Sequence, residues 1–324
     1  MLTVYGVKDE ALLPLKSATA EDIRRAVWID LLNLTKDEEN LVEETLHISV
    51  PTREEMQEIE ISNRLYTENG ATYMTITAVT RLGSDEPEFS PVTFILTAEK
   101  LVTVRYAEPY SFQMFAARAK SPDSGYYCGQ VVFIGLIEAM INRLADSVEL
   151  TGMDVDSISR EIFSKAQPDK KPDFQDILQR LGRKGDLSSK ILATLTSLAR
   201  MEHFFHETID FSHLPAAKEI DSRMVAIGKD ITSLADNVGY LGNKISFLLD
   251  ATLGFISIDQ NNVFKVFSIV TVCLMPPTLI GAIYGMNFKI LPELEWAWGY
   301  PFALVLMLVS GVLPLLYFRR KGWL

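Results

Sequence analysis

The sequence predicts an α+β domain, then a long stalk helix that continues into an α-helical membrane domain of two transmembrane helices. Three observations support this fold class. Strand and helix signals alternate in the first third of the chain, an apolar heptad pattern follows residue 216, and two uncharged apolar runs lie near the C-terminus. Together they place a sizeable soluble domain before a short membrane domain.

The first third of the 324-residue chain mixes strand and helix signals. Residues 26–34 predict a buried strand, and Thr35 before four charged residues predicts a helix N-terminus. Residues 66–80 predict a hairpin turning at 68–70, and residues 91–106 predict two more strands around 98–100. After about Tyr110 the signals are nearly all helical, with a break from Gln167-Pro168 to Pro172.

Two stretches near the C-terminus, residues 266–288 and 300–318, carry no charged side chain. A helix that crosses a bilayer core needs about 20 apolar residues. A buried core helix would explain one such run, but two runs separated by a short polar loop favour two spans. Trp296, Trp298 and Tyr300 lie where an aromatic belt would anchor the second span.

Basic residues follow the second run directly, and the positive-inside rule predicts that they stay in the cytoplasm. Two spans then return the N-terminal domain to the same side. The N-terminus has no basic region followed by an apolar stretch, so no cleavable signal peptide is expected. The predicted parts are a cytoplasmic α/β domain with a helical portion (1–215), a stalk helix (216–262), a first transmembrane helix (263–288), a periplasmic loop (289–299), a second transmembrane helix (300–318) and a basic cytoplasmic tail (319–324).

The formal net charge of −11 is unevenly distributed. From Asn261 onward there are five basic and two acidic residues, so the first 260 residues hold the other 26 basic and 40 acidic ones, a charge of −14. This balance disfavours nucleic acid as a partner and favours cations, although acidic surfaces also simply keep a domain soluble. Cys128 and Cys273 form no disulfide framework. We expect no enzyme, since no paired nucleophile and base, phosphate loop or cofactor motif is found.

A heptad series predicts the stalk helix. It has strict 3-4 spacing over more than four heptads, and nine of its ten positions are apolar. The seam either contacts neighbouring subunits in a stalk bundle or packs only within its own subunit. Its members are Met224, Ile227, Ile231, Leu234, Val238, Leu241, Ile245, Leu248, Thr252 and Phe255.

The first apolar run carries a stripe of polar and small residues at roughly helical spacing, formed by Asn261, Ser268, Thr271, Met275, Thr278 and Ala282. In a membrane, such a stripe faces other helices or water. Phe264 and Phe267 lie near the same face and could form a hydrophobic constriction. Ordinary helix packing through small residues is the alternative. Pro276-Pro277 is predicted to interrupt the helix.

The first run ends in Tyr-Gly-Met-Asn-Phe (284–288), followed by Pro-Glu-Leu (292–294), Trp296, Gly-Tyr-Pro (299–301), a second span and a basic tail. This pattern resembles the CorA family of divalent-cation (magnesium) transporters, within the 2-TM-GxN superfamily. The resemblance is strong from Asn261 to Leu324 and weaker around residues 27–31. Phe264 and Phe267 depart from the family, which often has Met and Leu there, and Leu291 replaces a usual Met.

The resemblance implies a homopentamer in a bacterial or archaeal inner membrane, with both termini cytoplasmic. Gly285, Met286 and Asn287 would form the outer pore mouth and selectivity site. Residues lining the path would be Asn261, Phe264, Phe267, Thr271, Met275 and Thr278. Arg319, Arg320 and Lys321 would form a basic ring around the inner pore.

The implied activity is passive, membrane-potential-driven uptake of Mg2+, with Co2+ and Ni2+ as further candidate ions. Mg2+ would also be a regulatory ligand that closes the pore when it is abundant inside the cell. The candidate regulatory ligands are Asp221, Asp230, Asp236 and Asp250. The alternatives are a zinc transporter of the related ZntB branch and a membrane-anchored sensor or scaffold. His203 and His206 have the spacing of a zinc pair, but no cysteine or third ligand lies nearby in the sequence.

Overall fold

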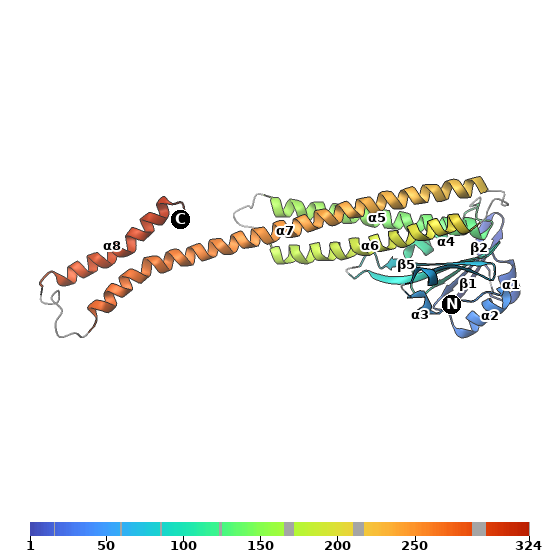
Figure 1. The fold of residues 1–324 in the computed structure, drawn as a ribbon, viewed down its shortest axis with the longest axis horizontal. Coiled ribbons are helices and arrows are strands. Elements are labelled where there is room, and N and C mark those ends of the chain that lie inside the picture. The colour runs from blue at the N-terminus through green and yellow to red at the C-terminus, as the bar shows by residue number, and fades with distance from the viewer. Residues whose placement is uncertain are drawn as a thin grey trace. The chain divides into compact units, whose positions relative to one another are not determined.

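The structure, a computed structural model, describes residues 1–15, 17–58, 60–84, 86–122, 125–164, 172–209, 217–286 and 296–323. The chain forms two compact units, Met1–Leu249 and Asp250–Leu324. The first unit is built on one mixed sheet covered by helices on both faces (Figure 1). The second consists of the C-terminal part of one long helix together with the last helix of the chain.

The sheet of the first unit has seven strands in the order β2-β1-β3-β7-β6-β5-β4. β3 and β7 pair in parallel, and the other neighbours pair antiparallel. The strands are β1 (Leu2–Lys8), β2 (Ala11–Pro14), β3 (Trp28–Leu32), β4 (Leu65–Glu68), β5 (Ala71–Thr80), β6 (Glu88–Leu96) and β7 (Leu101–Arg105).

Helices α1 (Ala20–Arg25), α2 (Lys36–Leu46) and α3 (Arg53–Met56) lie on one face of this sheet, and a short 3-10 helix (Ile61–Asn63) precedes β4. Each of the three begins with a capping box, in which a threonine accepts from a backbone N–H three residues on. The predicted cap at Thr35 is one of them and is confirmed. The remaining helices are α4 (Tyr110–Ala119), α5 (Gly129–Phe163), α6 (Phe174–Thr208), α7 (Ala217–Tyr284) and α8 (Gly299–Arg320).

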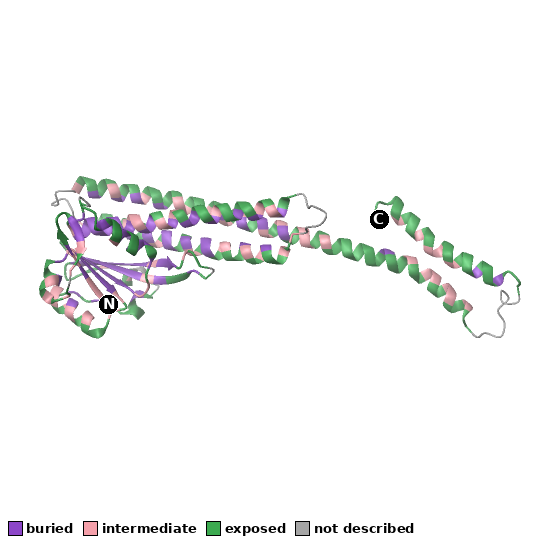
Figure 2. Cartoon of the chain, turned by 180° about the vertical axis from the view of Figure 1, so that it is seen from behind, coloured by how far each residue is buried: buried purple, intermediate pink, exposed green. Residues whose placement is uncertain are grey.

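Alternating strand residues fill two cores, one on each face of the sheet. Ile29, Tyr73 and Val102 face α1, α2 and α3, whereas Trp28 and Phe94 face the larger core under α4, α5, α6 and α7. Most strand residues are therefore buried (Figure 2). This two-sided burial explains why the strands read as nearly continuous apolar runs in the sequence.

Most sequence predictions for the first unit are confirmed. The hairpin is β4–β5, and Asn69 and Gly70 adopt φ values of 51° and 78°, which its tight turn requires. The two strands predicted after it are β6 and β7. Strands β1 and β2 were not predicted. The predicted break lies between α5 and α6, and Gln167-Pro168 lies outside the described residues.

The heptad seam is buried within the chain. Met224, Ile227, Ile231 and Val238 belong to the core that α7 shares with α5 and α6. Ion pairs reinforce this bundle: Arg223 donates two hydrogen bonds to Glu138 of α5, at 2.8 and 2.9 Å, and Lys244 pairs with Asp156. For this part of the seam the intra-subunit contact, one of the two alternatives left open by the sequence, is what the structure shows.

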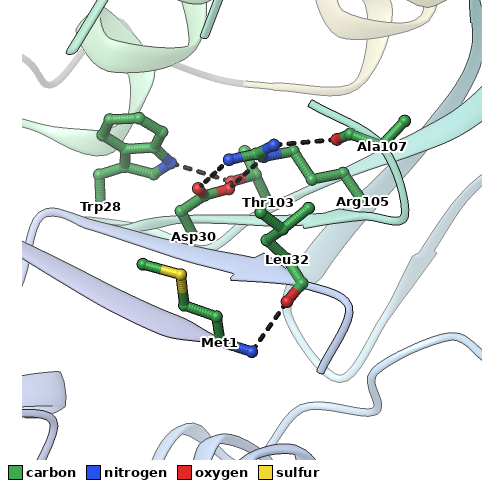
Figure 3. Close-up of polar contacts among 7 residues, drawn as sticks. All are labelled: Met1, Trp28, Asp30, Leu32, Thr103, Arg105 and Ala107. Carbon is green, nitrogen blue, oxygen red and sulfur yellow. Dashed lines mark hydrogen bonds and ion pairs between the residues drawn. The ribbon is translucent and has the colours of Figure 1, made fainter. Parts of the chain in front are cut away.

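A buried polar network ties β3 to β7 on the face under α4 (Figure 3). Arg105 donates to both carboxylate oxygens of Asp30, at 3.0 and 2.7 Å, and a further hydrogen bond joins it to the carbonyl of Ala107. Thr103 donates to Asp30 at 2.7 Å and accepts from the indole N–H of Trp28 at 3.0 Å. Every member is hydrogen-bonded, so the buried charges are compensated.

Candidate functional site

The second unit exposes two apolar helical stretches. The C-terminal part of α7 and the whole of α8 are each long and apolar enough to cross a membrane, and only 6% of the most apolar window of either helix is buried. The core helix of a soluble protein would be buried, so that alternative is wrong for both helices. Apolar surface of this extent requires lipid or other protein chains to cover it (Figure 2).

Glycines let α7 and α8 approach each other closely. A Cβ at Gly311 of α8 would lie 3.3 Å from the Cys273 carbonyl oxygen and 3.3 Å from the Pro277 ring. A Cβ at Gly281 would lie 3.7 Å from the end of Met307. Residue numbers rise along one helix as they fall along the other, so the helices are antiparallel. The packing of small residues is typical of helix pairs in membranes.

The prolines of α7 do not interrupt the helix, contrary to the prediction. α7 is continuous from Ala217 to Tyr284 with Pro276 and Pro277 inside it. Because proline has no N–H, the carbonyls of Val272 and Cys273 lose their usual donors. Gly311 of α8 lies at the Cys273 carbonyl, so the neighbouring helix covers this weakened turn. The sequence analysis missed this role of Gly311, although a glycine within an apolar span is a usable signal.

The polar stripe of α7 lies on one uncovered face. Its predicted lining residues are all exposed in the chain: Asn261, Phe264, Phe267, Thr271, Met275 and Thr278. The residues that are buried or half-buried lie on the other side, among them Ile269, Cys273, Pro276 and Ile280. At 3.6 residues per turn these two sets occupy different faces of the helix. α8 therefore packs behind the stripe and leaves it free.

The hydroxyl groups of the stripe donate to their own helix. Thr271 donates to the Phe267 carbonyl at 2.9 Å, and Thr278 donates to the Leu274 and Met275 carbonyls at 3.0 and 2.8 Å. A hydroxyl oxygen has two acceptor lone pairs, and donating its proton leaves both in place. The hydroxyl oxygens of Thr271 and Thr278 can therefore accept hydrogen bonds from molecules next to the stripe.

The predicted outer mouth begins where α7 ends. The Gly285 N–H donates to Gly281 at 2.9 Å, the Met286 N–H donates to Ile283 at 3.2 Å, and Met286 is exposed. Asn287, the third predicted mouth residue, lies outside the described residues, as do residues 288–295 of the segment that follows. Its selectivity role stays a prediction.

The basic residues lie at the end of α8. Arg319 and Arg320 are its last two residues, Lys321 follows them, and all three are exposed. The Lys321 ammonium group lies 5.4 Å from the centre of the Tyr317 ring. Because α8 runs antiparallel to α7, this cluster belongs to the same end of the second unit as Asn261. The three basic residues and the first residue of the polar stripe therefore lie at the same end of the helix pair, as the prediction of a basic ring around the inner pore requires.

The four candidate regulatory aspartates are spread along α7. Asp230, Asp236 and Asp250 are exposed, and Asp221 lies 3.5 Å from His206 of α6. His203 is exposed beside Glu207, at 3.3 Å. Among the described residues, no three metal-ligating side chains come together in one chain. The regulatory role of these aspartates stays a prediction.

These features define a class: an α-helical membrane protein with two spans, a soluble domain built on a mixed sheet, and an uncovered polar stripe on its first span. Residues 24–320 match the family described as "CorA-like Mg2+ transporter protein". The chain is 32% identical over 324 residues to the magnesium transport protein CorA of Pectobacterium atrosepticum and to that of Escherichia coli strain K12, covering each chain completely. It therefore belongs to the CorA family.

The fold agrees with this membership. The complete structure of the CorA magnesium transporter from Methanocaldococcus jannaschii superimposes with a TM-score of 0.75 at 15% identity, covering 100% of this chain and 99% of that one. At this identity the likeness concerns the fold alone. The predicted fold class is confirmed, including the two membrane helices and the long helix that leads into them.

Proposed function

We propose that this chain transports Mg2+ across a bacterial or archaeal inner membrane as a homopentameric channel. The single observation that carries the proposal is the 32% identity over the full length to magnesium transport proteins of the family. The uncovered stripe on α7 supports it, since symmetry-related copies of this face could enclose a wet path. Both termini would be cytoplasmic, as the basic residues after α8 favour.

The chemistry of the stripe suits a hydrated cation. Mg2+ holds its water shell tightly and gives it up reluctantly. The water molecules around a cation direct their hydrogens outward, so a conduit for the hydrated ion needs acceptors. The Thr271 and Thr278 hydroxyls supply them because their protons are donated to the helix. Five Asn287 amide oxygens at the outer mouth would act in the same way, together with Gly285 and Met286, without stripping water from the ion.

Phe264 and Phe267 would narrow the path toward its cytoplasmic end. Their exposed fractions are 68% and 67% in the chain, and in a symmetric assembly these rings would form a hydrophobic constriction that closes by dewetting. The ring of Arg319, Arg320 and Lys321 would add a positive barrier in the closed state. Abundant internal Mg2+, held between subunits by aspartates of α7, would favour that closed state.

The proposed flow is passive. A divalent ion that enters a compartment 100 mV more negative gains about 4.6 kcal/mol, because each charge gains about 2.3 kcal/mol. Co2+ and Ni2+ share the charge of Mg2+ and are further candidate ions. Zinc transport is the alternative within the superfamily, and a competition assay between Mg2+ and Zn2+ separates the two.

The decisive experiment is Mg2+ flux into vesicles that contain the purified full-length protein. Asn287→Ala should abolish selective Mg2+ flux, because the ring of amide oxygens at the outer mouth is lost. Asn262→Ala makes the same substitution at an exposed residue beside the stripe and should leave the flux unchanged. Unchanged flux in Asn287→Ala would refute the assigned selectivity site, and no flux in the unmodified protein would refute transport.

A further inference from the structure

A pocket in the first unit has the features of an anion-binding site. It has a volume of about 260 Å³ and lies between the end of β5, the start of α4, α5 and α6. Residues from all four elements line it, including Arg81, Tyr110, Ser111, Arg143 and Thr194. Ligand pockets in proteins typically have volumes of about 300–1,000 Å³, and this pocket lies just below that range, so it would hold only a small ligand.

Two arginines line this pocket, and Arg143 of α5 is the one without an ion-pair partner among the described residues. Its guanidinium group lies 5.4 Å from the centre of the Tyr110 ring, and its Nε atom is shielded from solvent without a hydrogen-bond partner. Among the described residues, none forms an ion pair with Arg143. The other arginine, Arg81, is already paired with Glu88 at 2.7 Å. Arg143 is half-buried, and its Nε–H would gain from an anionic ligand that accepts its hydrogen bond.

The start of α4 supplies neutral donors to the same pocket. Pro109 occupies the N-cap position and gives no side-chain cap, so the N–H groups of Tyr110 and Ser111 have no acceptor within the helix. The Ser111 side chain is only 4% exposed, lines the pocket and has no hydrogen-bond partner in the part of the chain that the structure describes. A helix N-terminus attracts negative charge, and the Ser111 hydroxyl group can donate a hydrogen bond to a ligand in the pocket.

The other lining residues indicate which kind of anion the pocket could hold. Val79, Leu82, Met140 and Leu144 contribute apolar surface. Glu108 also lines the pocket and would repel an anion bound next to it. It is exposed, so water weakens this repulsion.

We propose that this pocket binds a small organic anion that carries one phosphate or carboxylate group on an apolar body. The oxyanion accepts hydrogen bonds from Arg143, Ser111 and the start of α4, and the apolar body lies against Met140 and Leu144. The proposal does not depend on transport. Its ligand contacts α4 and α5 of the first unit and binds only the folded protein, so binding also raises the thermal stability of the protein.

The test is calorimetric titration of the full-length protein in detergent and Mg2+-free buffer. Phenyl phosphate and benzoate are the anionic probes, and benzyl alcohol is the neutral probe of similar shape. We expect saturable binding of an anion with one site per chain, and weaker binding of benzyl alcohol. Arg143→Gln should weaken binding by about tenfold or more, since a charge-assisted hydrogen bond is lost. Arg143→Lys keeps the positive charge, and its affinity for the anion should lie between those of the unmodified protein and Arg143→Gln.

Arg160→Gln is the matched control, because it removes an arginine from an exposed position of the same helix outside the pocket. It should bind phenyl phosphate as the unmodified protein does. Ser111→Ala is a second test variant and should weaken binding several-fold. The melting temperature of each variant without ligand shows that it is folded. Equal binding by Arg143→Gln and Arg160→Gln, equal binding of benzyl alcohol, or no anion binding at millimolar concentration would each overturn the proposal.

Discussion

At the scale of single residues, Asp30 and Arg105 form a buried ion pair that joins β3 to β7. The exposed fractions of the two side chains are 6% and 8%, and 75 positions separate them in the chain. A charged residue within each of two apolar strands is visible in the sequence. That these two meet depends on the parallel register of β3 and β7, which places Asp30 opposite Thr103, and no local pattern encodes this register.

Asp30→Ala should destabilise the protein by about 3–5 kcal/mol, because it leaves Arg105 buried without its counter-charge. The matched control is Glu88→Ala, which breaks the exposed pair with Arg81, whose side-chain exposures are 55% and 63%. That change should cost less than about 1 kcal/mol. The measurement is the melting temperature of the full-length protein in detergent. Similar losses in the two variants would show that the buried network contributes no more than a surface pair.

At the scale of elements, the two membrane helices were predictable and their contact was not. The absence of charge over a span is a local property of the chain, and so is the spacing of Thr271, Met275 and Thr278. The register of α7 against α8 depends instead on residues far apart in the chain, such as Pro277 and Gly311, which are 34 positions apart. The heptad seam has the same limit. Its spacing predicts that the helix makes an apolar contact, but does not identify the helix that it contacts.

Gly311→Ala should push α8 away from α7. The added Cβ would lie 3.3 Å from a backbone carbonyl and 3.3 Å from a proline ring, and neither can move freely. Overpacking of this kind costs about 1–3 kcal/mol. Gly281→Ala is the control, since its Cβ would make an ordinary contact at 3.7 Å with a flexible methionine. A lower melting temperature for Gly311→Ala alone is expected, and the reverse order would contradict the packing.

The orientation of the stripe is tested by cysteines at two neighbouring positions. Thr271 belongs to the stripe and Val270 does not, and both are exposed in the chain. In a protein whose Cys128 and Cys273 are replaced by serine, a membrane-impermeant thiol reagent should block most of the Mg2+ flux through Thr271→Cys. It should leave Val270→Cys unaffected, because adjacent residues point about 100° apart on a helix. Equal inhibition of both variants would show that the stripe does not line the path.

At the scale of the whole molecule, the confirmed predictions concern the fold and family of one chain, whereas the untested ones concern the pore mouth and the assembly. The fold class follows from composition and periodicity, and the family membership extends it to the full length of the chain. The role of Asn287 rests on resemblance, because this residue lies outside the described residues. The number of subunits is likewise a property of an assembly, which the periodicity of one chain does not encode.

Mass measurement of the detergent-solubilised protein tests the assembly directly. Five chains of 36.4 kDa should form one particle, after correction for bound detergent. A monomeric particle that still transports Mg2+ would contradict a path enclosed by several copies of α7.

The proposed driving force, the membrane potential, is also tested on the whole molecule. In vesicles that hold a potassium gradient, valinomycin sets the membrane potential. An inside-negative potential of 100 mV should raise the equilibrium ratio of internal to external Mg2+ by about three orders of magnitude, since about 4.6 kcal/mol is gained per ion. Collapsing the gradient should abolish this accumulation, and vesicles with Asn287→Ala should not accumulate Mg2+ at any potential. Mg2+ accumulation that does not change with the membrane potential would contradict a potential-driven uptake and would require another energy source.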